Sequence, residues 1–311
     1  MSLFRKILVA ADFSPGSRDA FDTACSLAGG DEARLTILHV RPELEGRGPE
    51  EGREAAIDRL REAYVPDRPL AVEYLVRDGE PRDVLIAGAA ERRPDLLVMG
   101  THGRTGLGRL VMGSVAEEVL RRAACPVLIR RSRRGDDAGR PARRPARVIL
   151  HPTDFSASSD AALRVARALA RDQGAKLVLL HVLQVLAAAH IDVPPTVEDP
   201  EICRQTLQSM CEALDDQDLR QSVTPQLKLG QPISEILRAA EDDRCDLLVM
   251  GTHGRTGLGR LLMGSMAEEV LRRTTCPVLL VRAGLTTPAE AEHALAGGRA
   301  GTQGAAAPRP G

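Results

Sequence analysis

Two glycine-rich stretches carry the strongest chemical signal in the sequence. Residues 100–114 are Gly-Thr-His-Gly-Arg-Thr-Gly-Leu-Gly-Arg-Leu-Val-Met-Gly-Ser, and residues 251–265 repeat them with one substitution. Glycine lets backbone N–H groups approach an anion closely. A helix that starts at the end of such a loop points free N–H groups and the positive end of its dipole at the same place. Each stretch therefore predicts a phosphate-binding loop built mainly from backbone.

The spacing of these glycines excludes two common nucleotide-binding patterns. A P-loop needs Lys and then Ser or Thr after its last glycine, but Arg109 and Leu110 stand there. The pattern G-x-G-x-x-G also fails, because Arg, Leu and Val follow Gly108. The spacing that remains is G-x2-G-x9-G-S, and it occurs once in each half of the chain, ending at Ser114 and at Ser265.

The glycine-rich stretches belong to a longer internal repeat. Residues 95–128 align with residues 246–279 without a gap and differ at four positions, and residues 5–8 and 12–14 align with 147–150 and 154–156. A repeat of this length matches two whole domains rather than a solenoid. We predict domains at 1–131 and 147–282, an Arg/Pro/Gly-rich linker at 132–146, and a disordered tail at 283–311.

Short apolar runs alternate with helical patterns in each half. In the first half the predicted strands are residues 6–10, 35–40, 70–76, 96–99 and 127–130, and the predicted helices follow Ser14 and cover 49–64, 81–91 and 114–122. Ser14 and Ser114 are the predicted N-caps. Apolar strands that alternate with helices predict an α/β fold: two tandem, Rossmann-like, doubly wound parallel-sheet sandwiches.

In such a sheet, ligands bind beyond the carboxyl ends of the strands. Asp12 follows the first strand, Val40 ends the second, and Gly100 ends the fourth. These three segments should converge with the phosphate-binding loop.

With its G-x2-G-x9-G-S spacing, its Asp-Phe-Ser segment and its Cys-Pro-Val-Leu last strand, the chain resembles the nucleotide-binding branch of the universal stress protein family, in a tandem arrangement. The resemblance implies an adenine nucleotide alpha hydrolase-like sandwich that binds ATP, with AMP or another adenine nucleotide as the alternative and Mg2+ as a companion of the nucleotide. It also implies a set of nucleotide-binding residues: Asp12 and Asp154 beside ribose and adenine, Val40 and Val182 on adenine, Gly100, Gly103, Gly251 and Gly254 along ribose and phosphate, Gly113, Ser114, Gly264 and Ser265 on the phosphates, Val115 and Met266 through the next N–H, and His102 and His253 within the motif.

Several of these residues have a purely structural alternative. Asp12 and Asp154 could simply be favourable charges at helix N-termini. The arginines of the glycine-rich loops could pair with phosphate or remain solvated. His39 and His181, on nearly apolar strands, are predicted to be buried histidines with satisfied hydrogen bonds. The six cysteines form no metal-ligand spacing, so we expect no metal site and reduced thiols.

Composition excludes other classes of protein. Lys plus Arg is 42 and Asp plus Glu is 43, a net charge of −1, and aromatic residues make up 2% of the chain. Neither value favours binding to nucleic acid, by a basic surface or by base stacking. No apolar run is long enough to span a membrane and the N-terminus lacks a signal sequence, so the expected location is the cytoplasm.

The predicted function is a non-catalytic, stress-response or regulatory protein with two adenine nucleotide sites, without an evident nucleophile and base. The alternatives are a slow ATPase or related nucleotide-dependent enzyme on the same fold, and a scaffold with vestigial sites. The apolar fifth strands, 127–129 and 278–281, should be sheet edges. We expect them to pair within the chain, or to support a homodimer, because an exposed apolar edge favours association.

Overall fold

The structure is a computed structural model that describes residues 3–30, 32–42, 52–101, 113–131, 144–184, 198–213, 222–254 and 263–284. Most of both glycine-rich loops, most of the predicted linker and nearly all of the predicted tail therefore lie outside the described residues. His102 and Gly103 are among them.

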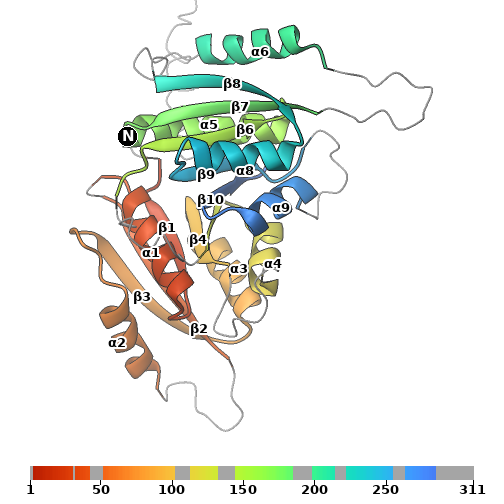
Figure 1. Cartoon of the computed structure of the whole chain (residues 1–311). Coiled ribbons are helices and arrows are strands. Elements are labelled where there is room, and N and C mark those ends of the chain that lie inside the picture. Colours follow the sequence, from red (N-terminus) through yellow and green to blue (C-terminus); the bar gives the residue numbers. More distant parts are fainter. Residues whose placement is uncertain are drawn as a thin grey trace, which may run out of the picture.

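The first half follows the predicted alternation of strands and helices (Figure 1). Its elements are β1 (Lys6–Ala11), α1 (Pro15–Leu27), β2 (Arg34–Arg41), α2 (Arg53–Ala63), β3 (Ala71–Asp78), α3 (Pro81–Arg92), β4 (Leu96–Gly100), α4 (Ser114–Arg122) and β5 (Val127–Arg130).

The second half repeats this order, and α6 takes the place of α2 before the third strand. Its elements are β6 (Val148–Thr153), α5 (Ala157–Gln173), β7 (Lys176–Gln184), α6 (Pro200–Glu212), β8 (Val223–Gly230), α8 (Pro232–Asp242), β9 (Leu247–Gly251), α9 (Ser265–Arg273) and β10 (Val278–Val281).

All ten strands of the described residues form one sheet, in the order β3-β2-β1-β4-β5-β10-β9-β6-β7-β8. Neighbouring strands are parallel except β5 and β10, which pair antiparallel with Leu128 opposite Leu279. Two contacts across this seam mirror each other: Arg131 donates to the carbonyl of Thr274, and Arg282 donates to the carbonyl of Ala123. The two halves are thus related by a pseudo-two-fold axis that passes through the β5–β10 pair.

Helices cover both faces of the sheet, which confirms the predicted α/β class. One hydrophobic core lies under α1, α2, α5 and α6, and the other lies under α3, α4, α8 and α9. Leucine, valine, isoleucine and alanine supply most of both cores. No helix within the described residues is both long and apolar enough to cross a membrane.

The helix starts agree with the sequence in one place and differ in another. Ser14 caps α1, and its side chain accepts a hydrogen bond from the N–H of Ser17. Ser114 was expected to cap α4, which is wrong: Ser114 is the first residue of the helix, and Gly113 is the cap and makes no side-chain bond. A glycine cap leaves the first N–H groups of α4 without a side-chain acceptor from the cap itself.

The end of the predicted linker is packed against the second half. The N–H of Ala146 donates to Gln173 at 3.0 Å, and Arg144 pairs with Asp246 at 3.2 Å. Residues 144–146 therefore belong structurally with the elements that follow them.

Candidate functional site

Each half of the sheet has a cavity at the carboxyl ends of its central strands. In the first half the strand order changes direction between β1 and β4, where open α/β sheets bind ligands. A cavity of about 320 Å³ lies there. Its walls include six of the predicted site residues, namely Asp12, Val40, Gly100, Gly113, Ser114 and Val115.

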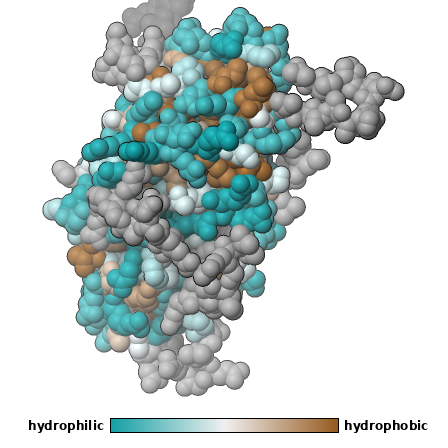
Figure 2. All heavy atoms as spheres, viewed as in Figure 1, coloured by the Kyte–Doolittle hydropathy of each residue, from teal (hydrophilic) through white to brown (hydrophobic). Residues whose placement is uncertain are grey.

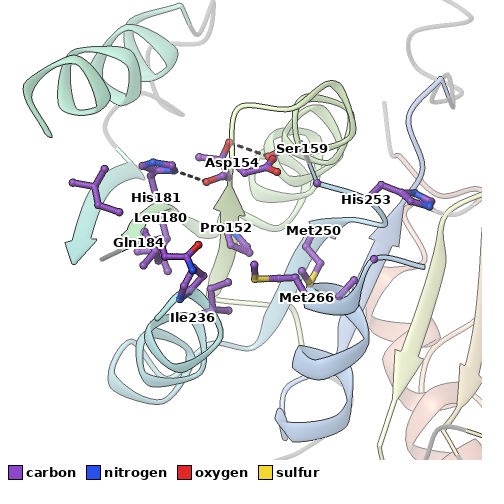
Figure 3. Close-up of a pocket in the computed structure, with 18 of the residues that line it drawn as sticks. Pro152, Asp154, Ser159, Leu180, His181, Gln184, Ile236, Met250, His253 and Met266 are labelled. Atoms are coloured by element: carbon purple, nitrogen blue, oxygen red, sulfur yellow. Dashed lines mark hydrogen bonds between the residues drawn. The ribbon is translucent and has the colours of Figure 1, made fainter. Parts of the chain in front are cut away.

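The second half has the corresponding cavity between β6 and β9, with a volume of about 410 Å³. Predicted site residues in its walls are Asp154, Val182, Gly251, His253, Gly254, Gly264 and Met266. Ser265 is exposed at the start of α9 and is not part of the wall. Figure 3 shows Asp154 and His181 on one side of this cavity and Met250 and Met266 across from them. Both volumes fall in the range of small-molecule sites, roughly 300–1,000 Å³.

The two ends of each glycine-rich loop are tied together beside the cavity. The N–H of Gly113 donates to the carbonyl of Thr101 at 3.1 Å, and the N–H of Gly264 donates to the carbonyl of Thr252 at 2.8 Å. A Cβ at Gly113 would lie 3.1 Å from that same carbonyl oxygen. Glycine therefore lets the loop close tightly where the helix N-terminus faces the cavity.

The aspartates bend the chain after the first strand of each half. Asp12 Oδ1 accepts hydrogen bonds from the N–H and the hydroxyl of Ser14, at 3.0 and 2.6 Å. Asp154 Oδ1 accepts from the N–H of Ser156 at 3.1 Å. Both carboxylates thus support a helix start, as the structural alternative proposed, and both also line a cavity.

Backbone strain marks the same turns. Phe13 has φ +64° and Phe155 has φ +61°, which non-glycine residues adopt rarely. Their rings lie beside the cavity histidines, with centroid distances of 4.8 Å from Phe13 to His39 and 4.4 Å from Phe155 to His181. The strained turn therefore sets both the aspartate and the aromatic ring at the cavity edge.

The two strand-end histidines are buried and hydrogen-bonded, as predicted. His39 Nδ1 lies 2.7 Å from the carbonyl of Ala11, and His181 Nδ1 lies 2.8 Å from that of Thr153. Because a carbonyl only accepts, Nδ1 carries the proton in each ring. Both histidines also form part of the cavity walls, a role that the apolar strand pattern did not reveal.

His253 is the site residue with an unusual hydrogen-bond state. Its Nδ1 lies 2.9 Å from the hydroxyl of Thr252, whereas its Nε2 is buried and has no partner among the described residues. Gly254 follows it, and a Cβ there would come within 2.8 Å of Asp154 Oδ2. The start of the second glycine-rich loop is thus packed directly on the aspartate turn.

Sequence reasoning missed several wall residues. The apolar ones sit at corresponding positions in the two halves: Leu38 with Leu180, Met99 with Met250, and Pro81 with Pro232. Each proline begins a helix that follows the third strand. The repeated Gly-x-Pro at residues 79–81 and 230–232 was the available signal, since a proline at a helix start fixes the entry of the chain.

The cavity of the second half opens among apolar side chains. Figure 2 shows hydrophobic side chains gathered over this half, between hydrophilic ones. Leu229 and Met266 are exposed by 67% and 39% and line the cavity. Such a mouth suits a flat, partly apolar ring better than a strongly charged group.

Comparisons with known proteins agree with this architecture. The model of the universal stress protein family matches residues 3–131 and 145–282. A universal stress protein of Mycobacterium tuberculosis is 30% identical over 272 residues, which are 80% of this chain and 87% of that protein. A shorter one, from Methanocaldococcus jannaschii, is 34% identical over 140 residues, which are 41% of this chain and 82% of that protein.

A solved structure has the same overall fold. The universal stress protein of Archaeoglobus fulgidus superimposes with a TM-score of 0.61 at 20% identity, covering 89% of this chain and 98% of that one. Family matches in both halves and relatives of full and half length lead to one conclusion: the chain belongs to the universal stress protein family and carries its domain twice in tandem.

Proposed function

We propose that each cavity binds one adenine nucleotide, ATP in the first instance, and that the protein acts as a nucleotide-responsive regulator without significant turnover. The observation that carries this proposal is the meeting of three features at one place in each half. These are a cavity at the switch point of the sheet, a glycine-capped helix start, and an aspartate turn.

The adenine would lie at the apolar end of the cavity. Val40 and Val182 lie near the carboxyl ends of β2 and β7 and would offer backbone N–H and carbonyl groups there, and Leu38 and Leu180 supply apolar wall. Asp12 and Asp154 would accept hydrogen bonds from the ribose hydroxyls. These contacts select a nucleoside by shape and a few polar groups, as is usual in small-molecule sites.

The phosphates would lie at the start of α4 or α9. The first N–H groups of a helix and its positive dipole end favour an anion. Gly113 and Gly264 keep this end open, and the buried Nε2 of His253 offers a further polar atom in the second half. Residues 102–112 and 255–262, among them His102 and Gly103, lie outside the described residues. Any Mg2+ would accompany the phosphates.

Two equivalents of nucleotide per chain is the expected result of a binding titration with purified full-length protein. Gly113→Ala should remove one equivalent and Gly264→Ala the other. A methyl group at Gly113 would press on the carbonyl oxygen of Thr101, and one at Gly264 on that of Thr252. The measurement is isothermal titration with ATP, ADP, AMP and cAMP, together with mass spectrometry of any nucleotide that co-purifies.

Gly30→Ala is the matched control. Gly30 has φ +68°, so alanine is strained there, but open space surrounds it and it is not part of either cavity wall. Binding that survives Gly30→Ala and is lost in the two cavity variants supports the proposal. Absence of any nucleotide binding to the wild-type protein would contradict it, and would favour the scaffold alternative.

Slow ATP hydrolysis is the enzymatic alternative. A phosphate-release assay separates it from simple binding, since a regulator without turnover releases no phosphate above the background. Several turnovers per minute that depend on Asp12 or Asp154 would establish an enzyme instead.

We also propose that the antiparallel β5–β10 pair takes the place of a dimer interface in the tandem chain, leaving a cytoplasmic protein with two sites. The reciprocal contacts of Arg131 and Arg282 support it. Whether the chain forms a further homodimer stays a prediction for light scattering.

A further inference from the structure

A second chemical cluster lies beside the cavity of the second half. His181 is near the end of β7, Glu198 directly precedes Asp199, the N-cap of α6, and Cys203 lies in the first turn of α6. One ligand atom from each of the three lies within 4.8 Å of the other two. His181 and Cys203 are buried, with exposures of 3% and 6%, while Glu198 is half-buried. Such a combination of N, O and S atoms departs from the expectation of no metal site.

The hydrogen bonds of His181 orient it as a ligand. Its Nδ1 donates to the carbonyl of Thr153, so the neutral ring presents the lone pair of Nε2 on the other side. That lone pair faces Glu198 Oε2 at 3.1 Å. Two acceptors at this distance need a cation between them, either a proton or a metal ion. An imidazole held through its other nitrogen by a backbone carbonyl is a common arrangement in metal sites.

The helix fixes the third member of the cluster. Asp199 caps α6 and Pro200 is its first residue, and the N–H of Cys203 donates to the carbonyl of Asp199 at 3.0 Å. This hydrogen bond holds Cys203 in the first helical turn, beside Asp199, which directly follows Glu198 in the chain.

We propose that His181, Glu198 and Cys203 bind one Zn2+ ion at the edge of the second cavity. Histidine nitrogen, carboxylate oxygen and thiolate sulfur are the ligands that Zn2+ takes, at roughly 2.0–2.3 Å. Tetrahedral coordination at these distances puts ligand atoms about 3.3–3.6 Å apart, so the widest separation in the cluster must shorten by roughly 1 Å. On binding, the Cys203 thiol gives up its proton to solvent and its sulfur bonds to the metal.

The fourth coordination position faces the cavity. Glu198 and His181 line the cavity wall, whereas Cys203 is buried and is not part of that wall. Water from the cavity, or a ligand bound in it, can therefore complete the coordination. A zinc site with three protein ligands and one open position has this form.

The first half lacks this cluster among its described residues. Helices α2 and α6 occupy corresponding places in the two halves. Aligning the fully buried Leu60 of α2 with the fully buried Leu207 of α6 also aligns Tyr64 with Cys211, four residues later in each case. In the same alignment, Ala56 of α2 occupies the position that corresponds to Cys203. The expected stoichiometry is therefore one Zn2+ per chain, although the domain occurs twice.

Metal binding is tested on the full chain without nucleotide, so that its outcome is separate from that of the proposed function. Zn2+ is titrated in competition with a chromogenic chelator, and Co2+ is added to a second sample. A thiolate bound to Co2+ gives a charge-transfer absorption in the near ultraviolet that carboxylate and imidazole ligands do not give. The wild-type protein should bind one equivalent and show this absorption.

Cys203→Ser should abolish the absorption and weaken Zn2+ binding at least tenfold. Cys211→Ser is the matched control, because Cys211 lies on the same helix and is also buried but is outside the cluster. Glu198→Gln, at the surface end of the cluster, should also weaken binding and does not depend on repacking the core. Absence of Zn2+ binding, or binding that Cys203→Ser leaves unchanged, would mean that a proton joins His181 to Glu198 and would overturn the proposal.

Discussion

The two halves hold the same aspartate turn by different means. In the first half the N–H of Phe13 donates to the hydroxyl of Tyr64 at 3.0 Å, and that hydroxyl also contacts Ser17 Oγ at 2.6 Å. Tyr64 comes from the end of α2, far along the chain. In the second half the N–H of Phe155 donates to Thr153 Oγ1 at 3.1 Å, only two residues away.

A second difference lies two residues before Thr153, within β6. His151 is completely buried, and its Nδ1 lies 2.8 Å from the carbonyl of Val249 while its Nε2 contacts Ser159 Oγ at 3.3 Å. The repeat places Val9 at the same point of β1, where the environment is apolar. The comparison teaches that this fold keeps the backbone path of the site while the side chains that support it are free to change.

Acidification should reveal the largest difference between the halves. Burial lowers the pKa of His151 from 6.5 to about 4. Between these values the unfolded chain binds a proton that the folded chain does not, so stability falls as pH decreases from 6.5 toward 4. The expected loss is roughly 2 kcal/mol by pH 5, approaching about 3 kcal/mol at pH 4. Urea unfolding at pH 7 and pH 5 measures it.

His151→Val, which copies the first half, is the variant that isolates this contribution. Its stability at pH 7 should be lower, because Ser159 and the carbonyl of Val249 lose a partner. Its additional loss between pH 7 and pH 5 should be smaller than that of the wild type. An identical pH dependence in both proteins would show that His151 is not the group responsible.

Removing one hydroxyl should have a smaller and local effect. Tyr64→Phe removes the acceptor of the Phe13 N–H and one of the partners of the Ser17 hydroxyl, which keeps its bond to the carbonyl of Ser14, at a cost of about 1–2 kcal/mol. Hydrogen exchange should accelerate at the amide of Phe13 and stay unchanged at that of Phe155. Thr153→Val is the reciprocal variant and should accelerate exchange at Phe155 alone. Equal acceleration at both amides in either variant would show that the two turns are coupled.

The smallest effect is expected where the halves are alike. Glu118 pairs with Arg121 on α4, and Glu269 pairs with Arg272 at the same place on α9. The hydrogen bond from Arg121 lowers the pKa of Glu118, but such exposed pairs are screened by solvent. Glu118→Gln and Glu269→Gln should leave the urea midpoint unchanged at pH 7. A clear shift of the urea midpoint in only one of the two variants would show that α4 and α9 differ in their contribution to stability.

The sequence by itself determined the repeated α/β fold, the alternation of strands and helices, and the glycines that end β4 and β9 and precede α4 and α9. These features follow from local spacing, since apolar periodicity and glycine positions act within a few residues. Even so, a serine before an apolar helix was not enough to locate the cap of α4, because Gly113 meets the carbonyl of Thr101 through a contact across the loop.

Only the tertiary structure decided which distant side chains meet. Tyr64 reaches the turn at Phe13, β5 pairs with β10 across the two halves, and Cys203 comes beside His181 although α6 is a separate element. Such contacts depend on the packing angle of a helix on the sheet and on the register of strands. Neither is encoded in the spacing of residues along one element, so the chain must fold before they exist.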